Sequence, residues 1–529
     1  MAEGSQAVGH APKVYGTHGA IRGLSNDSKT TATPSWPEYA RFEGLFGKMF
    51  RELPESRFSG RLLGDLADAM TSSTGKTPPE GEPNDSENTG TEDDPGISAG
   101  YTYLAQFIDH DISFDPASSF QKKKDPDALI DYRTPRFDLD NLYGRGPADQ
   151  PYLYQRDGKS FILGDALGGN DEDKGACDLP RNDERYGRRA IIGDPRNDEN
   201  EILSQLHAAM LRFHNLMVKK HHDLTFDQIQ QMVRWHYQWI VLHDFLPTIV
   251  NGKTLGSILP HIEKGTTIDE DRPRLTIFNP RRWGKAVFMP VEFSVGAYRF
   301  GHSMIRPSYR LNKNADRIPL RDLFGFRPLQ EGRAIDWSLF FPAKRQPPNG
   351  KNGLQWAYKI DTALVHPLGE VPERVLPEEP KSLREQSLAW RDLVRGVQTS
   401  LPSGQAVAEA MGENPIPDDE LMIGPATEAS ARNNRPLVRF SRTFARDFKN
   451  NAPLWFYILA EAQRVFKNNR TPIRLGPVGG RIVAEVIVGL MDADTDSVLH
   501  QKGFVPGFPA GKGFSMWDLL EHVRQNGSH

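Results

Sequence analysis

The sequence predicts a mainly α protein, built as one large helical domain with long irregular loops and few short strands. Amphipathic helical patterns recur along much of the chain, strand signals are few and short, and no internal repeat is present. The chain has 529 residues, among them 28 Phe, 14 Tyr and 9 Trp, which is ample apolar material for an extensive core. We therefore expect a single elaborated domain and not a string of small modules.

The clearest helices are expected at residues 200–222 and 226–245, where apolar residues recur every three or four positions on a broad stripe. Pro247 follows the second pattern and is expected to end that helix. A proline-rich connection, residues 340–383, is expected to wrap around the helical body. Further helices are expected at residues 384–399, 403–411, 453–466, 478–491 and 515–524.

Composition suggests three parts of the chain. Residues 1–95 are expected to form an N-terminal extension, residues 96–500 the main domain, and residues 501–529 a C-terminal segment packed on that domain. Residues 71–97 are acidic and rich in Gly, Pro and Ser, a composition typical of a flexible loop.

Charge and cysteine content exclude several classes of protein. The formal net charge of −4 argues against nucleic acid as the main partner, because no basic excess is present to neutralise phosphates. A single cysteine, Cys177, excludes an intrachain disulfide framework. The best apolar run, residues 482–491, is short for a bilayer span and contains Glu485. The first residues lack a basic region followed by an apolar core, so we expect a soluble protein, cytoplasmic or exported without a recognisable signal peptide.

The segment AQFIDHDISFDPASSF, residues 105–120, places charged groups in an apolar stretch. Gln106 and His110 are four residues apart and would share one helical face, where a neutral histidine can act as an acid or base near pH 7. Farther along, Arg196 and Glu199 are three apart and could meet on one face. Alone, each pattern is also typical of a solvated helix end.

A third motif, RTPRFDLDNLYG at residues 133–144, concentrates oxygen-bearing side chains on an irregular segment. Thr134, Asp138 and Asp140 offer the hydroxyl and carboxylate oxygens that Ca²⁺ prefers, although the EF-hand pattern is missing. Asp111 would be a natural remote ligand. The alternative interpretation is an Asx-type turn.

Histidines elsewhere are harder to assign. His302 lies among apolar residues in AYRFGHSMIRP, where a histidine is usually a core residue but can also be an axial haem ligand. His207, His214 and His221 recur every seven residues without the spacing of a zinc site. No Walker loop, GxSxG elbow or GxGxxG motif is present, which disfavours phosphoryl transfer, serine hydrolysis and dinucleotide chemistry.

Taken in order, the motifs are more specific. Q-x-x-D-H-D, T-x-x-x-D-x-[DS]-x-x-Y-G, R-x-x-E and R-x-x-H together resemble the haem peroxidases of the peroxidase–cyclooxygenase superfamily, the family of mammalian myeloperoxidase and lactoperoxidase. The resemblance spans about residues 96–500 and continues in residues 391–404 and 475–494. Without disulfides or propeptide, the sequence resembles a bacterial-type member. It implies a single helical haem-peroxidase domain.

The resemblance implies a role for each motif residue. His110 would be the distal base, Gln106 its partner, and Arg196 the cation that polarises peroxide. His302 would be the proximal ligand of the iron in haem b. The expected Ca²⁺ ligands are Asp111, Thr134, Arg136 (through its carbonyl), Asp138 and Asp140.

Further positions concern the haem itself. Asp109 and Glu199 fall where the animal enzymes form ester links to haem, whereas Asn200 replaces the methionine that makes a third link in myeloperoxidase. Asp392 falls where the family has an asparagine beside the proximal histidine; a carboxylate there would lower the iron potential and weaken halide oxidation. Arg299 and Arg395 would lie near the haem propionates.

The resemblance therefore implies a peroxidase that reduces H₂O₂ or an organic hydroperoxide through a ferryl intermediate and oxidises small organic or (pseudo)halide donors. Two alternatives stay open. A fatty-acid dioxygenase or cyclooxygenase-like enzyme would have a radical-forming tyrosine three residues before His302, where this sequence has Arg299, with Tyr298 one step away. A non-catalytic haem-binding or adhesion protein would have no need of the full motif set. The sequence gives no expectation of oligomeric state.

Overall fold

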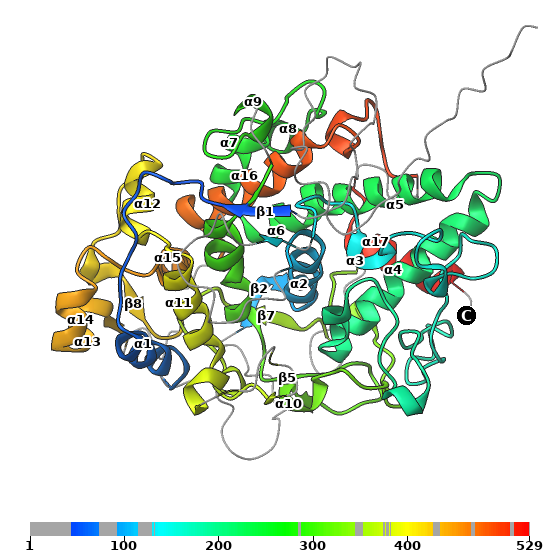
Figure 1. Cartoon of the computed structure of the whole chain (residues 1–529), viewed down its shortest axis with the longest axis horizontal. Helices are drawn as coiled ribbons and strands as arrows, with labels where there is room; N and C mark the ends of the chain where they lie inside the picture. Colours follow the sequence, from blue (N-terminus) through cyan, green and yellow to red (C-terminus); the bar gives the residue numbers. More distant parts are fainter. Residues whose placement is uncertain are drawn as a thin grey trace, which may run out of the picture.

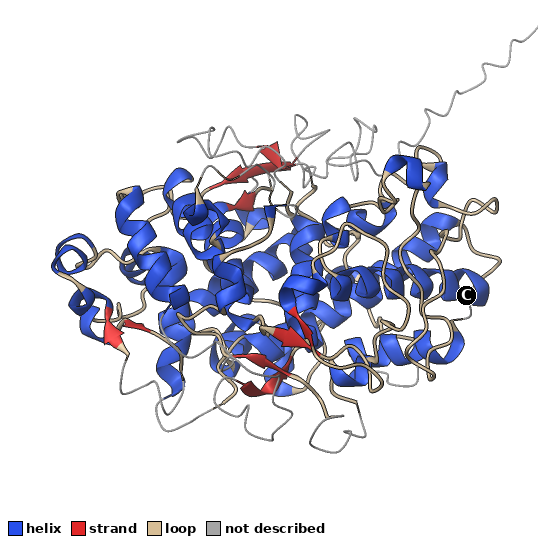
Figure 2. Ribbon diagram, turned by 90° about the horizontal axis from the view of Figure 1, so that it is seen from below, coloured by secondary structure: helices blue, strands red, loops and turns tan. Residues whose placement is uncertain are grey.

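The structure is a computed structural model of the chain. It describes residues 44–72, 93–114, 130–131, 133–283, 287–343, 353–373, 376, 380, 382–426, 434–466, 471–507 and 513–527. Helices are the main regular elements of this body, and strands are few and short (Figure 1, Figure 2). The predicted mainly α fold is therefore confirmed.

The helices follow the predicted apolar patterns closely. The longer ones are α1 (Gly60–Ser72), α2 (Gly100–Ile112), α4 (Glu201–Lys220), α5 (Phe226–Ile240), α11 (Leu388–Gln398), α12 (Gly404–Ala410), α15 (Leu454–Gln463), α16 (Pro477–Ala493) and α17 (Met516–Asn526). The shorter ones are α3 (Asp140–Tyr143), α6 (Leu246–Ile249), α7 (Gly252–Ile258), α8 (Pro260–Lys264), α9 (Pro280–Trp283), α10 (Leu320–Leu323), α13 (Leu437–Phe440) and α14 (Arg442–Asp447). Thr225 and Gln228 form a capping box that fixes the start of α5.

Irregular helical turns connect these elements. Four of them bear on the cavities described below: the 3₁₀ turns η5 (Pro195–Asp198), η8 (Ala297–Met304) and η9 (Trp337–Leu339), and the π-helix η7 (Glu292–Gly296). A second π-helix, η6 (Val241–Phe245), joins α5 to α6. The other turns are η3 (Pro151–Leu153), η4 (Glu184–Tyr186), η10 (His366–Gly369), η12 (Leu383–Gln386), η13 (Asp418–Glu420), η14 (Arg464–Phe466) and η15 (Val498–His500).

The prediction that Pro247 ends the helix at 226–245 is wrong. The chain stays helical through η6 and α6 as far as Ile249. Pro247 lies in the first turn of α6, where the backbone N–H that proline lacks would have no helical partner, so the ring is tolerated.

The strands form four small sheets around the helices. They are β1 (Gly44–Gly47), β2 (Asp93–Ser98), β3 (Ile130–Asp131), β4 (Met289–Pro290), β5 (Ser308–Tyr309), β6 (Ile318–Pro319), β7 (Trp356–Tyr358), β8 (Met422–Ile423) and β9 (Arg435–Pro436). β1 pairs antiparallel with β3 and parallel with β4, where Phe46 faces Met289. The other three pairs, β2–β7, β5–β6 and β8–β9, are antiparallel.

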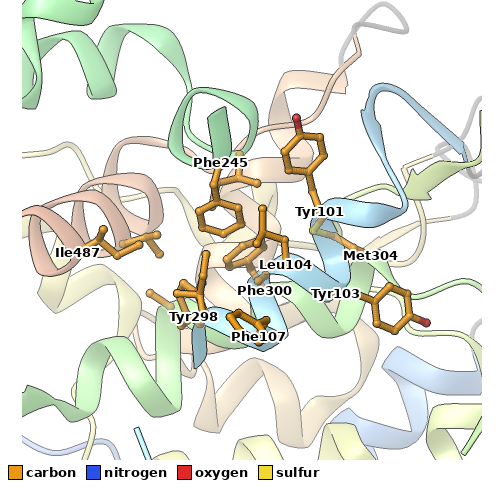
Figure 3. Close-up of a cluster of buried hydrophobic side chains, with 14 of the residues drawn as sticks. Tyr101, Tyr103, Leu104, Phe107, Phe245, Tyr298, Phe300, Met304 and Ile487 are labelled. Atoms are coloured by element: carbon orange, nitrogen blue, oxygen red, sulfur yellow. The ribbon is translucent and has the colours of Figure 1, made fainter. Parts of the chain in front are cut away.

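Helix α2 lies in the centre of the core. Its residues are buried throughout except at Gln106. Figure 3 shows Leu104 and Phe107 of α2 in one buried cluster with residues of η8 and α16, among them Phe300, Met304 and Ile487. The helix starts at Gly100, where a Cβ atom would lie 2.5 Å from the carbonyl oxygen of Phe340, so this close approach requires glycine.

The expected loop at 71–97 falls mostly outside the described residues. Its two ends are regular, because α1 reaches Ser72 and β2 begins at Asp93. Helix α1, which we placed in an N-terminal extension, buries Leu62, Leu66 and Met70 in the main core and contacts α11. At the other end of the chain, α17 contacts α4. The boundaries of the three parts stay a prediction.

No helix among the described residues is both long and apolar enough to cross a membrane. In α16, the most apolar stretch we noted in the sequence, Glu485 is fully buried and accepts hydrogen bonds from the backbone N–H groups of Thr276 and Ile277 at 2.6 and 2.7 Å.

Candidate active site

A cavity of about 370 Å³ brings together side chains from α2, η5, η8 and α11. These segments are far apart in the sequence, and only the packing of α2 against η8 and neighbouring helices joins them. Every residue that we assigned to catalysis or haem binding lines this cavity: Gln106, Asp109, His110, Arg196, Glu199, Arg299, His302, Asp392 and Arg395.

The His110 ring is buried and its tautomer is fixed by its neighbour. Nδ1 lies 2.7 Å from the amide oxygen Oδ1 of Asn197. Because that oxygen can only accept, Nδ1 carries the proton and Nε2 keeps a lone pair. Burial, and then the nearby cation of Arg196, lower the pKa of His110 to about 4. The ring is therefore neutral at neutral pH, as a general base must be.

A second histidine lies behind this pair. The Asn197 amide donates from Nδ2 to Nδ1 of His207 at 2.9 Å, so Asn197 bridges the two imidazoles. His207 is fully buried, and burial lowers its pKa to about 3. Neither residue was predicted from the sequence to belong to the site. The seven-residue spacing of histidines drew attention to His207, whereas no sequence pattern pointed to Asn197.

Arg196 is held against the end of α2. Its Nη2 donates to the carbonyl oxygens of His110 at 3.1 Å and Ser113 at 2.7 Å, and pairs with Asp194 at 2.8 Å. The guanidinium also lies 4.3 Å from the ring centroid of Phe114. Although burial raises it, Arg196 and Arg133 hold the pKa of Asp194 well below its usual range. The partner of Arg196 is thus Asp194.

Glu199 instead contacts Gln106. The Nε2 amide of Gln106 donates to the Glu199 carboxylate, and the Nδ2 amide of Asn200 donates to Oε1 of Gln106 at 3.1 Å. Although Arg196 and Glu199 are three residues apart, their side chains have different partners: Arg196 pairs with Asp194 and the carbonyl oxygens at the end of α2, and Glu199 with Gln106. Burial raises the pKa of Glu199 to about 7, with Arg196 opposing the shift.

The His302 ring is oriented by a carboxylate. Nδ1 of His302 donates to Oδ2 of Asp392 in α11 at 2.6 Å. This bond fixes the tautomer and leaves Nε2 with its lone pair, the arrangement typical of a metal-ligating histidine. The sequence placed Asp392 beside His302 only through the resemblance.

The residues beside His302 complete this side of the cavity. Arg299 donates from Nε to the carbonyl oxygen of Ser294 at 2.9 Å, and its Nη1 lies 3.8 Å from Oδ2 of Asp109. Tyr298 also lines the cavity, and its hydroxyl is buried without a hydrogen-bond partner among the described groups. The guanidiniums of Arg299 and Arg395, the histidine backed by a carboxylate and a cavity of this size fit a haem with its anionic propionates.

Next to the cavity, three buried carboxylates converge. One oxygen atom from each of Asp111, Asp138 and Asp140 lies within 4.8 Å of the others. Thr134 donates from its hydroxyl to Asp138 at 3.0 Å. Burial, then Asp138 and Asp140, raise the pKa of Asp111 well above its usual range, since like charges are forced together.

This donor set fits a divalent cation. Tyr237 lies close to Asp111, yet neither carboxylate oxygen of Asp111 meets hydrogen-bond geometry with any described group. A hard cation would satisfy such oxygens. The predicted side-chain ligands Asp111, Thr134, Asp138 and Asp140 therefore do come together. The Arg136 guanidinium lies 3.4 Å from Asp494.

Comparisons with known proteins bear on the family and the fold. Residues 118–336 match the family model of animal haem peroxidase. Over these residues the chain is similar to animal haem peroxidases. The predicted resemblance is thereby confirmed, although the match does not support a bacterial-type member in particular. No curated protein matches the sequence significantly.

Solved structures show the same fold. Peroxidase A from Dictyostelium discoideum is 13% identical with a TM-score of 0.60, covering 97% of this chain and 98% of that chain. Fatty acid α-dioxygenase from Oryza sativa, in a structure with palmitic acid, is 13% identical with a TM-score of 0.52, covering 90% and 78%. Fatty acid α-dioxygenase from Arabidopsis thaliana is 13% identical with a TM-score of 0.51, covering 90% of this chain and 75% of that chain. The chain therefore shares its fold with a peroxidase and with fatty acid α-dioxygenases.

Proposed function

We propose that this protein is a haem peroxidase that reduces H₂O₂ or an organic hydroperoxide and oxidises small organic or (pseudo)halide donors. The observation that carries the proposal is the pairing of two histidines in one cavity. His110 is neutral with a bare Nε2, while His302 is backed by a carboxylate. The first suits proton transfer and the second suits iron ligation.

The protein's part in the reaction follows from these contacts. Haem b bound through Nε2 of His302 would supply the redox chemistry that accepts the oxidising equivalents of peroxide. His110 would take a proton from the peroxide at Nε2 and return it to the departing oxygen, which leaves as water. Arg196 would stabilise the negative charge on that oxygen. Gln106, held by Glu199 and Asn200, would position the peroxide.

The carboxylate behind His302 bears on donor choice. Asp392 accepts the Nδ1 proton of His302 in a bond of 2.6 Å, which would make the imidazole a stronger donor to a bound iron and lower the iron potential. We therefore propose that phenols and other one-electron donors are preferred over halides.

The same proposal includes two further sites. Asp111, Thr134, Asp138 and Asp140, with the carbonyl of Arg136, would hold Ca²⁺ and so fix the end of α2 that carries His110. Asp109 and Glu199 would form ester links to haem, since both line the haem cavity. Acid–acetone extraction tests the links, because haem that leaves the protein freely would show that none forms.

A donor screen tests the proposed function. Haem-loaded protein with H₂O₂ should consume peroxide in proportion to the oxidation of phenols, and bromide, iodide and thiocyanate should be poorer donors. Consumption of peroxide with no donor oxidised, or with fatty acid alone, would contradict it. His302→Ala should lose the native ferric haem spectrum, whereas an unchanged Soret band would refute the ligand assignment.

Tyr298 favours one alternative, a fatty-acid dioxygenase. Its buried hydroxyl lines the haem cavity without a partner, and burial and Asp109 raise its pKa well above the usual range. A tyrosine in such a place could form the radical that abstracts hydrogen from a lipid. Oxygen uptake with palmitic acid that disappears in Tyr298→Phe would support this alternative, whereas phenol oxidation retained in Tyr298→Phe supports the peroxidase.

A further inference from the structure

A second cavity, of about 210 Å³, shares no lining residue with the haem cavity. Two tryptophans line it, Trp337 of η9 and Trp517 of α17. The same cavity is lined by charged residues held in pairs: Lys313 lies 2.9 Å from Asp336, and Arg524 lies 2.7 Å from Glu521. The cavity therefore combines indole rings with fixed charges of both signs, a surface suited to a polar aromatic molecule.

A continuous line of aromatic rings joins the two cavities. Tyr103 of α2 lines the haem cavity, and its ring centroid lies 5.5 Å from that of Tyr309 in β5. Tyr309 stacks on Phe340 at 6.2 Å, and Phe340 meets Trp337 at 5.9 Å. In Figure 3 the ring of Tyr103 points away from the core cluster around Phe107 and Tyr298.

Because packing alone accounts for many aromatic contacts in a core, the evidence for a functional path lies in where the line of rings begins and ends. One end is a ring in the haem cavity, and the other is an indole at a different cavity. Tyr309 and Phe340 are fully buried, so no water interrupts the path, and Trp337 is 8% exposed, at the boundary. When the ring keeps its proton, an indole loses an electron more easily than a phenol or a phenyl ring does.

We propose that Trp337 is a second oxidation site, which draws electrons from bulky polar phenols in this cavity and passes them to the haem through Phe340, Tyr309 and Tyr103. The inference rests on the proposed peroxidase function. It adds a class of donor that need not enter the haem cavity.

The electrons and protons balance. Reduction of one peroxide at a bound haem would consume two electrons, and Trp337 would supply them one at a time along the rings. The indole becomes a radical cation and keeps its proton. A phenol in the second cavity returns one electron to the indole and releases its proton to water. Two phenols per peroxide complete the reaction, H₂O₂ + 2 AH → 2 H₂O + 2 A•.

Electron paramagnetic resonance tests the site without turnover. Holoenzyme treated with one equivalent of H₂O₂ and no donor should show a tryptophan radical signal. Trp337→Phe should lose the signal, because a phenyl ring is far harder to oxidise. Trp235→Phe should keep it, since Trp235 lies in α5 and lines neither cavity. Absence of the signal in the unaltered protein, or its survival in Trp337→Phe, would overturn the proposal.

Steady-state rates give the second measurement, with tyramine linked to dextran as the bulky phenol and guaiacol as the small one. Trp337→Phe should slow tyramine–dextran oxidation by roughly tenfold or more while leaving guaiacol oxidation unchanged. Trp337→Tyr, which restores an oxidisable ring, should recover part of the loss. Equal rates for both donors in every variant would refute the second site.

Two checks keep the outcomes distinct. A Soret band confirms that each variant holds haem; if Trp337→Phe does not, Phe340→Leu interrupts the ring line and must produce the same selective loss. If the unaltered protein oxidises neither phenol, the proposed peroxidase function itself fails. If only the selective loss is missing, the peroxidase function stands and the second site does not exist.

Discussion

At the scale of single residues, the site depends on the groups that hold His110 and His302. His110 is buried in α2, and Asn197 sets its tautomer. The carboxylate of Asp392 sets the tautomer of His302 in the same way. The two rings therefore have opposite tasks for a physical reason: the amide leaves His110 a weak base, and the carboxylate makes His302 a stronger electron donor.

Replacing Asn197 by Leu should slow the reaction with peroxide roughly tenfold to a hundredfold, the size typical of a lost orienting partner. The leucine cannot accept the Nδ1 proton of His110, so the ring can turn or adopt the other tautomer. Stopped-flow absorbance measures the rate. His207→Gln, which can still accept the Asn197 amide, is the matched variant and should lose less. An unchanged rate in Asn197→Leu would show that the bridge has no role.

The pH dependence of the same rate follows from the His110 pKa. Burial and Arg196 lower this pKa to about 4, so the ring is neutral above that pH and protonated below it. The rate constant for peroxide should therefore be flat through neutral pH and fall as the pH drops through about 4. A decline centred near the ordinary histidine value of about 6.5 would contradict the buried, neutral base.

Asp392→Asn should raise the iron midpoint potential by tens of millivolts, because an amide accepts the His302 proton less strongly than a carboxylate does. A spectroscopic redox titration measures the shift. The variant should also oxidise thiocyanate faster relative to guaiacol than the unaltered protein. A potential that stays the same or falls would show that Asp392 does not act on the iron.

At the scale of elements, helix α2 couples two sites. His110 and Asp111 are adjacent in sequence but lie in different places: the first lines the haem cavity, and the second joins the carboxylate group with Asp138 and Asp140. Arg133 links the carboxylate group to the cavity, because its guanidinium lies 3.4 Å from Asp140 and 2.5 Å from Asp194, the partner of Arg196. A cation bound here would fix the end of α2.

Removing Ca²⁺ should therefore lower both thermal stability and the rate with peroxide. At a hundredfold excess over its Kd, a bound ion contributes about 2.7 kcal/mol to the free energy of unfolding. Differential scanning calorimetry with and without chelator measures this. Asp138→Asn should lower Tm and remove the response to Ca²⁺, whereas Asp149→Asn, at an exposed acid, should change neither. A Tm that is unchanged by the chelator would show that no calcium ion is bound at this site.

Elements also show how far sequence patterns reach. The main helices were predictable because their apolar spacing is local, and α4 and α5 lie within a few residues of the expected ranges. The continuation of the helix past Pro247 was not predictable, because proline is accommodated there only in the first turn of α6, which follows the π-helix η6. The partner of Arg196 was missed because sequence spacing does not show which way a side chain turns: Arg196 pairs with Asp194, two residues earlier, and packs on the end of α2.

At the scale of the whole molecule, the site exists only after folding. His110 and Asn197 are 87 positions apart, and His302 and Asp392 are 90 apart. The order of the motifs along the sequence, through the family resemblance, pointed to polar residues that line the cavity, among them His110 and His302. They could not reveal Asn197 or the ring line from Tyr103 to Trp337, because contacts between distant segments leave no local pattern in one sequence.

The most direct test of the central claim is the reaction of the ferric haem protein with stoichiometric H₂O₂, followed by stopped-flow absorbance in the unaltered protein and in His110→Ala. The unaltered protein should change its Soret spectrum rapidly. His110→Ala should keep its haem and react about a hundredfold to ten-thousandfold more slowly. A spectrum that does not respond in the unaltered protein, or a near-normal rate in His110→Ala, would contradict the peroxidase assignment.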